Sequence, residues 1–162
     1  MPAADLRTTR SRSKLRRLLR RQACGLRLPC FIERSDTAAR PVLTVVALGE
    51  DQRFVELAAT IADARGLAIE IVGIVSPMAP KLPPDVLESS GAAALSRRFE
   101  RSTGTRPEWE VLHGRRAATA IERYVASRRP ALVALAHRAH RRGARCEAID
   151  IASRLTCSLV LI

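Results

Sequence analysis

The residues best suited to chemistry gather in one arginine-rich segment near the C-terminus. Arg138, Arg141, Arg142 and Arg145 lie close together in the chain, and Cys146 follows them directly. Guanidinium groups hold phosphate through paired N–H bonds, so this cluster indicates an anion-binding site. Cys146 also precedes a predicted helix, whose N-terminal partial positive charge favours anions and thiolates. A solvated loop in an arginine-rich protein explains the same residues, and the sequence leaves both interpretations open.

The residues nearest to a metal-ligand set are His137, His140 and Cys146. A structural zinc ion takes four ligands, so this set is one ligand short. The surrounding arginines also raise the free energy of placing a divalent cation there. We therefore expect no metal site.

Signatures of enzymatic catalysis are missing from the sequence. It contains no G-x-S-x-G elbow, no Walker G-x4-G-K-[ST] and no G-x-G-x-x-G after its first predicted strand. His113, beside Gly114, has no evident nucleophile partner and is more often a structural histidine. Glu50 and Asp51 more commonly favour the start of the helix that follows them. We therefore expect no catalytic residues and no enzyme.

The four cysteines form neither a disulfide framework nor a zinc motif. Cys24 and Cys30 are far from Cys146 and Cys157, no C-x2-C pair occurs, and no apolar signal segment precedes them. Reduced thiols in a cytoplasmic protein are the simplest interpretation. A membrane span needs about 20 apolar residues, and the apolar runs are far shorter, so we expect no span.

The elements that must position these residues follow a regular pattern after Arg40-Pro41. Apolar, β-branched runs predict five buried strands, at 42–48, 67–75, 109–112, 131–136 and 158–162. Helical spacing of apolar residues predicts the helices between them, at about 54–65, 85–102, 117–129 and 147–155. Alternating strands and helices predict an α/β fold, a doubly wound five-stranded parallel sheet with helices on both faces.

This order of elements resembles the universal stress protein (UspA-like) family over roughly residues 41–162. Two local matches carry the resemblance, the strand-to-helix opening Val42–Phe54 and the ending Ala148–Ile162 (AIDIASRLTCSLVLI). The resemblance implies an adenine-nucleotide alpha-hydrolase-like three-layer sandwich with strand order 3-2-1-4-5. It also implies a two-fold dimer.

The family's nucleotide-binding residues are largely replaced in this sequence. Ala47 stands where nucleotide-binding members of the family have Asp. Ala136 and Ala139 take the first two glycine positions of the family's G-x2-G-x9-G-[S/T] motif, and Arg145-Cys146 stands in place of its Gly-[S/T]. Glycine lets backbone N–H groups approach phosphate and allows positive φ, which alanine resists. We therefore expect the usual ATP cradle to be lost.

An alternative nucleotide site is predicted where the strand connections diverge, between 47–51 and 137–145. No cofactor is certain, and the ligands implied by the resemblance are ATP or AMP. The candidate nucleotide-binding residues are Ala47, Gly49, Ala136, Arg138, Ala139, Arg141, Arg145 and Cys146.

The net charge of +12 is concentrated at the N-terminus, where residues 1–40 contain 11 Lys and Arg against three acidic residues. Clustered cations bind nucleic acid or an anionic surface by releasing counterions. The candidate contacts are Lys14, Arg16, Arg17, Arg20 and Arg21. Aromatic residues are only 3% of the chain, which excludes a base-stacking platform for single strands.

Other interpretations of residues 1–40 remain open. The segment fits a disordered solvated arm and, less well because of Asp5, a transit-like peptide. It also resembles the last helix and strand of a preceding, now missing, domain, with the helix at Leu15–Cys24 and the strand at Leu26–Ile32. We expect a basic N-terminal extension at 1–40, partly disordered or such a remnant, and a universal-stress-protein-like domain at 41–162.

The C-terminal strand predicts an interface. Leu159, Val160, Leu161 and Ile162 include no charge or proline, and an unprotected apolar edge strand tends to aggregate. Pairing with the same strand of a second copy would protect it, so we expect a homodimer through this edge. A structure in which residues 11–34 cover the edge would exclude this dimer.

Together these features predict a non-enzymatic, cytoplasmic signalling or stress-response module of the universal stress protein type, with most ATP-binding residues lost and with a protein partner. The alternatives are a nucleic-acid or anionic-surface binder that uses the basic arm, and an adenine-nucleotide binder that uses the arginine-rich loop. Nucleic acid is the less favoured partner, because the body at 41–162 is only mildly basic.

Overall fold

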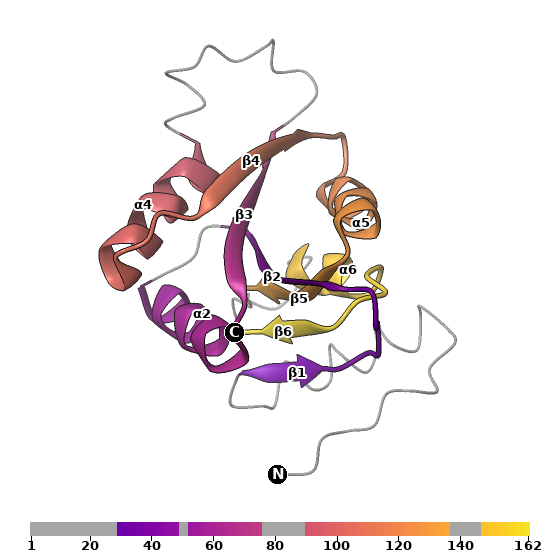
Figure 1. Ribbon diagram of the computed structural model, residues 1–162. Coiled ribbons are helices and arrows are strands. Elements are labelled where there is room, and N and C mark those ends of the chain that lie inside the picture. The colour runs from indigo at the N-terminus through magenta and orange to yellow at the C-terminus, as the bar shows by residue number, and fades with distance from the viewer. Residues whose placement is uncertain (1–28, 49–51, 76–89, 137–146) are drawn as a thin grey trace.

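The computed structural model describes residues 29–48, 52–75, 90–136 and 147–162, in which strands and helices alternate (Figure 1). The elements in chain order are β1 (Cys30–Ile32), β2 (Arg40–Val46), α2 (Gln52–Arg65), β3 (Ala68–Val75), α4 (Gly91–Thr103), β4 (Glu108–His113), α5 (Ala117–Arg128), β5 (Pro130–Leu135), α6 (Glu147–Ala152) and β6 (Leu159–Leu161).

The strands form one six-stranded sheet in the order β1-β6-β5-β2-β3-β4. The five predicted strands are β2 to β6 in the predicted spatial order, and neighbours among them pair in parallel. The predicted α/β fold class is therefore confirmed. The sixth strand, β1, pairs antiparallel with β6 and adds to the outer side of the predicted sheet.

Helices cover both faces of the sheet and produce three layers (Figure 1). Successive β2 residues point to opposite faces, as a strand requires: Val45 packs in the cluster with α2 and α4, and Val46 packs in the cluster with α5 and α6. Both clusters consist mainly of Ala, Val, Leu and Ile, and Phe99 of α4 is the largest fully buried side chain.

The helix ends follow their local sequence. Gly66 (φ 62°) and Gly104 (φ 75°) come directly after α2 and α4 in the left-handed conformation that glycine adopts without strain. Ser90 caps the start of α4, where its side chain accepts a hydrogen bond from the Ala93 N–H at 3.2 Å. The predicted start of this helix, at 85–89, lies outside the described residues. The last helix is shorter than predicted, because the chain turns at residues 153–154.

The expected dimer edge at Leu159–Ile162 is not open. β1 lies along it in the same chain, with Cys30 opposite Leu161, Phe31 opposite Val160 and Ile32 opposite Leu159. The prediction of a homodimer formed by direct pairing of this strand is therefore wrong. A segment of the expected extension, within residues 11–34, provides the protection that a second copy was expected to provide.

In the described ranges, no helix has both the length and the apolar character needed to cross a membrane.

Candidate functional site

The carboxyl ends of β2 and β5 meet where the chain connections diverge. From β2 the chain continues through α2 to β3 on one side, and from β5 it continues through α6 to β6 on the other. Val46 pairs with Leu135 in the parallel register, so Ala47 and Ala136 follow at adjacent strand ends. In open α/β sheets a ligand binds in the crevice at such a point.

The described surface at this switch point is apolar. Ala47 and Ala136 are half-buried against the cluster under α2 and α4, and Leu48 packs against the opposite cluster. The Ala47 N–H donates to the Val72 carbonyl at 2.8 Å, so the sheet already uses this amide. These strand ends can contact a flat apolar group such as a nucleobase, but they provide no charged side chain for a phosphate.

The other predicted site residues are not among the described residues. Those of the candidate nucleotide site are Gly49, Arg138, Ala139, Arg141, Arg145 and Cys146. Those of the candidate nucleic-acid surface are Lys14, Arg16, Arg17, Arg20 and Arg21. Both sets remain predictions.

A second concave site, which sequence reasoning missed, lies at the turn from β4 into α5. A groove of about 670 Å³ runs from the turn at 112–116 along α5, past Thr119 and Arg123 to Tyr124 and Ser127. His113, expected as a structural histidine, is exposed and lines this groove. The signal in the sequence was the pair Arg115-Arg116 in the turn between a strand and a helix, with Arg123 about two turns further along the helix.

Tyr124, which lines this groove, has a buried side chain. Tyr124 is 9% exposed, and its pKa is raised to about 12, first by burial and then by the negative charges of Glu70 and Glu110. The Thr44 hydroxyl, fully buried in the central strand, donates to Glu70 Oε1 at 2.5 Å. The phenol of Tyr124 therefore remains neutral over the physiological pH range.

The two cysteines in the described ranges are free thiols in protected positions. Cys157 is buried, and burial raises its pKa to about 11. Burial also raises the pKa of the half-buried Cys30 thiol. Because the thiolate is the reactive form, neither residue is suited to act as a nucleophile at neutral pH.

Comparison with known proteins rests on structure rather than sequence. No protein-family model matches the chain, and no curated protein matches it. A universal stress protein crystallised in complex with cAMP superposes with a TM-score of 0.58 at 18% identity, covering 75% of this chain and 95% of that one. A universal stress protein from Archaeoglobus fulgidus gives a TM-score of 0.60 at 14% identity, covering 75% and 97%.

A third solved structure, the universal stress protein from Archaeoglobus fulgidus in complex with dAMP, gives a TM-score of 0.57 at 16% identity, covering 75% of this chain and 96% of that one. About three quarters of this chain thus aligns with nearly the whole length of each of these proteins. At identities this low the likeness concerns the course of the backbone. The chain has the fold of the universal stress proteins.

Proposed function

We propose that this chain is a non-enzymatic signalling or stress-response module of the universal stress protein type that has lost the usual ATP cradle. Its fold supports the type of module. The ligands named for two of its structural neighbours, cAMP and dAMP, support an adenine nucleotide as the ligand class from which it has diverged.

The observation that supports the loss of the usual ATP-binding residues is the pair of alanines at the switch point. Ala47 and Ala136 stand where the family resemblance implies an Asp and a Gly, and their methyl groups pack against the cluster under α2 and α4. A carboxylate at residue 47 could orient a bound nucleotide, whereas a methyl group cannot. A glycine at 136 would give a phosphate closer access to the backbone.

Release of bound nucleotide from the purified protein tests this proposal. We expect mass spectrometry of the denatured protein to find no stoichiometric ATP, ADP or AMP. We also expect millimolar adenosine, which has no phosphate group, to leave the melting temperature unchanged, because only a ligand that binds the folded state raises it. Stoichiometric ATP in the released material, or steady hydrolysis of added ATP, would contradict the proposal.

The second candidate function is an adenine-nucleotide binder that uses the arginine-rich loop. The adenine nucleotides bound to two structural neighbours favour it. Under this alternative ATP or AMP raises the melting temperature of the full chain, and the double variant Arg138→Ala, Arg141→Ala abolishes the increase. The matched control is Arg53→Ala, Arg101→Ala, which removes two exposed arginines from α2 and α4.

A further inference from the structure

We propose that the groove between the end of β4 and α5 is a binding site for the phosphate group of a small phosphorylated molecule. It is a different site from the switch point, because it lies at the outer strand β4, and β3 separates β4 from β2 in the sheet. The proposal does not depend on the function proposed above.

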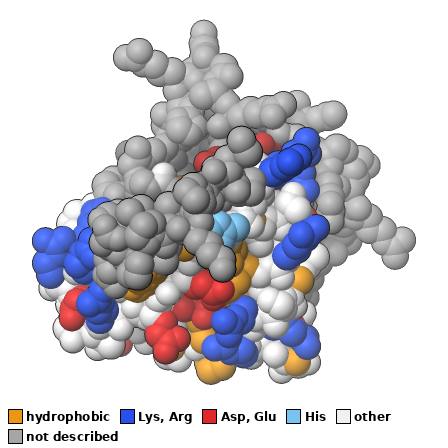
Figure 2. Space-filling model, turned by 90° about the horizontal axis from the view of Figure 1, so that it is seen from above, with side chains coloured by type: hydrophobic (Ala, Val, Ile, Leu, Met, Phe, Trp, Pro, Cys, Tyr) orange, Lys and Arg blue, Asp and Glu red, His pale blue; other side chains and the backbone are white. Residues whose placement is uncertain are grey.

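The size and place of the groove suit a small ligand. Its volume of about 670 Å³ falls within the range of about 300–1,000 Å³ that is typical of ligand pockets. It opens at the carboxyl end of β4, the end of a parallel sheet at which ligands usually bind. Figure 2 looks down on this end of the molecule and shows the exposed histidine with basic side chains to its right and acidic side chains below it.

The charged side chains among the described lining residues of the groove are basic. Arg115, Arg116 and Arg123 line it, and none of its described lining residues is acidic. A second groove in the described part of the chain, at the opposite ends of the strands, mixes Arg40 and Arg106 with three acidic residues. Like charges gathered on one concave surface raise each other's free energy, and a bound anion removes that cost.

The groove arginines also differ from the arginines around them in their partners. Arg128 contacts Glu110 at 3.3 Å, Arg129 contacts Asp36 at 2.7 Å, and Arg154 contacts Glu122 at 3.6 Å. In contrast, Arg115, Arg116 and Arg123 form no ion pair with any described residue. Their guanidinium groups are exposed and free to form the bidentate bonds that phosphate accepts.

The start of α5 adds backbone donors to the same place. The N-cap residue Arg116 makes no side-chain cap bond, and the first two helical N–H groups, of Ala117 and Ala118, have no acceptor among the described residues. The partial positive charge of this 12-residue helix therefore faces the arginine turn without a capping anion.

Close packing fixes the arginine turn against the helix. A Cβ at Gly114 would lie 2.9 Å from the Cβ of Ala120, so only glycine lets the turn approach α5 this closely. The contact holds Arg115 and Arg116 beside the α5 face that carries Arg123. The hydroxyls of Thr119 and Tyr124 further along the groove provide polar contacts for the rest of the ligand.

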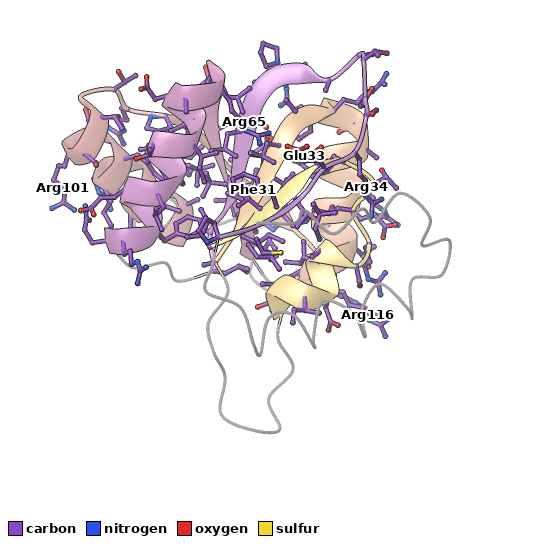
Figure 3. All side chains as sticks on the ribbon, turned by 90° about the horizontal axis from the view of Figure 1, so that it is seen from below. Phe31, Glu33, Arg34, Arg65, Arg101 and Arg116 are labelled. Atoms are coloured by element: carbon purple, nitrogen blue, oxygen red, sulfur yellow. The ribbon has the colours of Figure 1, made fainter. Side chains whose placement is uncertain are left out.

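Calorimetry on the full chain with inorganic phosphate, AMP and adenosine at constant ionic strength tests the site. We expect phosphate and AMP to bind and adenosine not to bind in the groove. The double variant Arg116→Ala, Arg123→Ala should weaken the phosphate and AMP affinity at least tenfold. The matched control Arg53→Ala, Arg101→Ala removes the same charge elsewhere, and Figure 3 shows Arg101 on the opposite side of the molecule from Arg116.

The following results decide the proposal. Loss of phosphate binding in the groove pair but not in the control supports it. Equal binding by both double variants, or no phosphate binding by the wild type, overturns it. AMP binding that is lost in Arg138→Ala, Arg141→Ala and kept in the groove pair also overturns it, and places the nucleotide at the switch point. The variant Arg116→Lys, Arg123→Lys retains the charge, so weakened binding there supports bidentate contact over general attraction.

Discussion

At the scale of single residues, the pKa of Tyr124 depends on the burial and the charges around it on the sheet face beside the groove. It is the only tyrosine of the chain, and the guanidinium carbon of Arg128 lies 5.6 Å from the centre of its ring. Glu70 and Glu110 disfavour its ionised form, as does its burial, and these effects outweigh the nearby Arg128. A single titration curve can therefore measure this local environment.

Titration of Tyr124 by its ultraviolet absorbance should give a midpoint near pH 12 in the native protein, against about 10 in denaturant. The folded pKa is raised, so the stability it contributes is complete below the unfolded pKa and is lost as the pH rises through the folded value. A midpoint near 10 while the far-ultraviolet circular dichroism remains native would contradict the described burial. Tyr124→Phe should remove the transition and serves as the control.

The residues at the switch point could be predicted from the sequence more readily than those of the groove. Ala47 and Ala136 were placed from strand ends and family resemblance, and both features can be read locally. The groove could not be predicted in the same way, because nothing in the sequence distinguishes Arg115, Arg116 and Arg123 from ordinary exposed arginines. They line one groove only because α5 packs against the sheet. Whether these arginines form ion pairs depends on which acidic residues lie near them, and the tertiary structure determines that.

At the scale of elements, β1 is held to the body of the protein by more than its pairing with β6. The buried Ser158 hydroxyl accepts from the Arg34 N–H at 2.8 Å and donates to the Arg34 carbonyl at 2.9 Å. Glu33 contacts Arg65 at 3.0 Å, and the guanidinium carbon of Arg65 lies 5.0 Å from the centre of the Phe31 ring. Figure 3 labels these three side chains in one region of the molecule. The segment therefore closes the sheet edge firmly.

Five strands could be predicted from local signals, whereas β1 could be suggested only as one interpretation among several. Val42–Leu48 and Ala131–Ala136 are apolar runs with clear stops, so the sequence alone indicates strands there. β1 is three residues long, and its Phe31 is 37% exposed. Its strand character comes from pairing with β6, about 130 residues later in the chain, and no local pattern carries that information.

The two neighbouring residues Ile32 and Phe31 test the role of β1. Ile32 is 3% exposed in the cluster beside α5 and α6, and Phe31 is exposed. Ile32→Asp loses about 1.5–3 kcal/mol of apolar burial and forces a carboxylate into the core. We expect β1 to detach, and the uncovered Leu159–Leu161 edge to pair with a second copy.

Light scattering coupled to size-exclusion chromatography measures this change. The mass of Ile32→Asp should rise above that of the wild type at the same concentration. Phe31→Asp adds the same charge one residue away, and its mass should not change. Equal masses for the two variants would show that β1 is not what keeps the edge closed.

At the scale of the whole molecule, β1 changes how the basic N-terminus must be tested. Deletion of residues 1–34 would remove the basic cluster and uncover β6 at the same time, so self-association could conceal any effect on binding. The excess positive charge of residues 1–40 lies before β1, because residues 29–40 contain two arginines and two acidic residues. Charge must therefore be removed by substitution within the full chain.

The full-length variant Arg16→Gln, Arg17→Gln, Arg20→Gln, Arg21→Gln separates a nucleic-acid binder from a module whose function lies in its α/β body. We expect it to retain the melting temperature of the wild type and its phosphate binding, because the groove belongs to the body. Each phosphate contact makes affinity fall with salt, so duplex DNA binding at 50 and 200 mM salt is the matching measurement. Tight, salt-dependent binding by the wild type that the variant loses would favour the basic arm as the functional surface. We expect neither protein to bind the duplex tightly, because residues 41–162, which make up most of the chain, are only mildly basic.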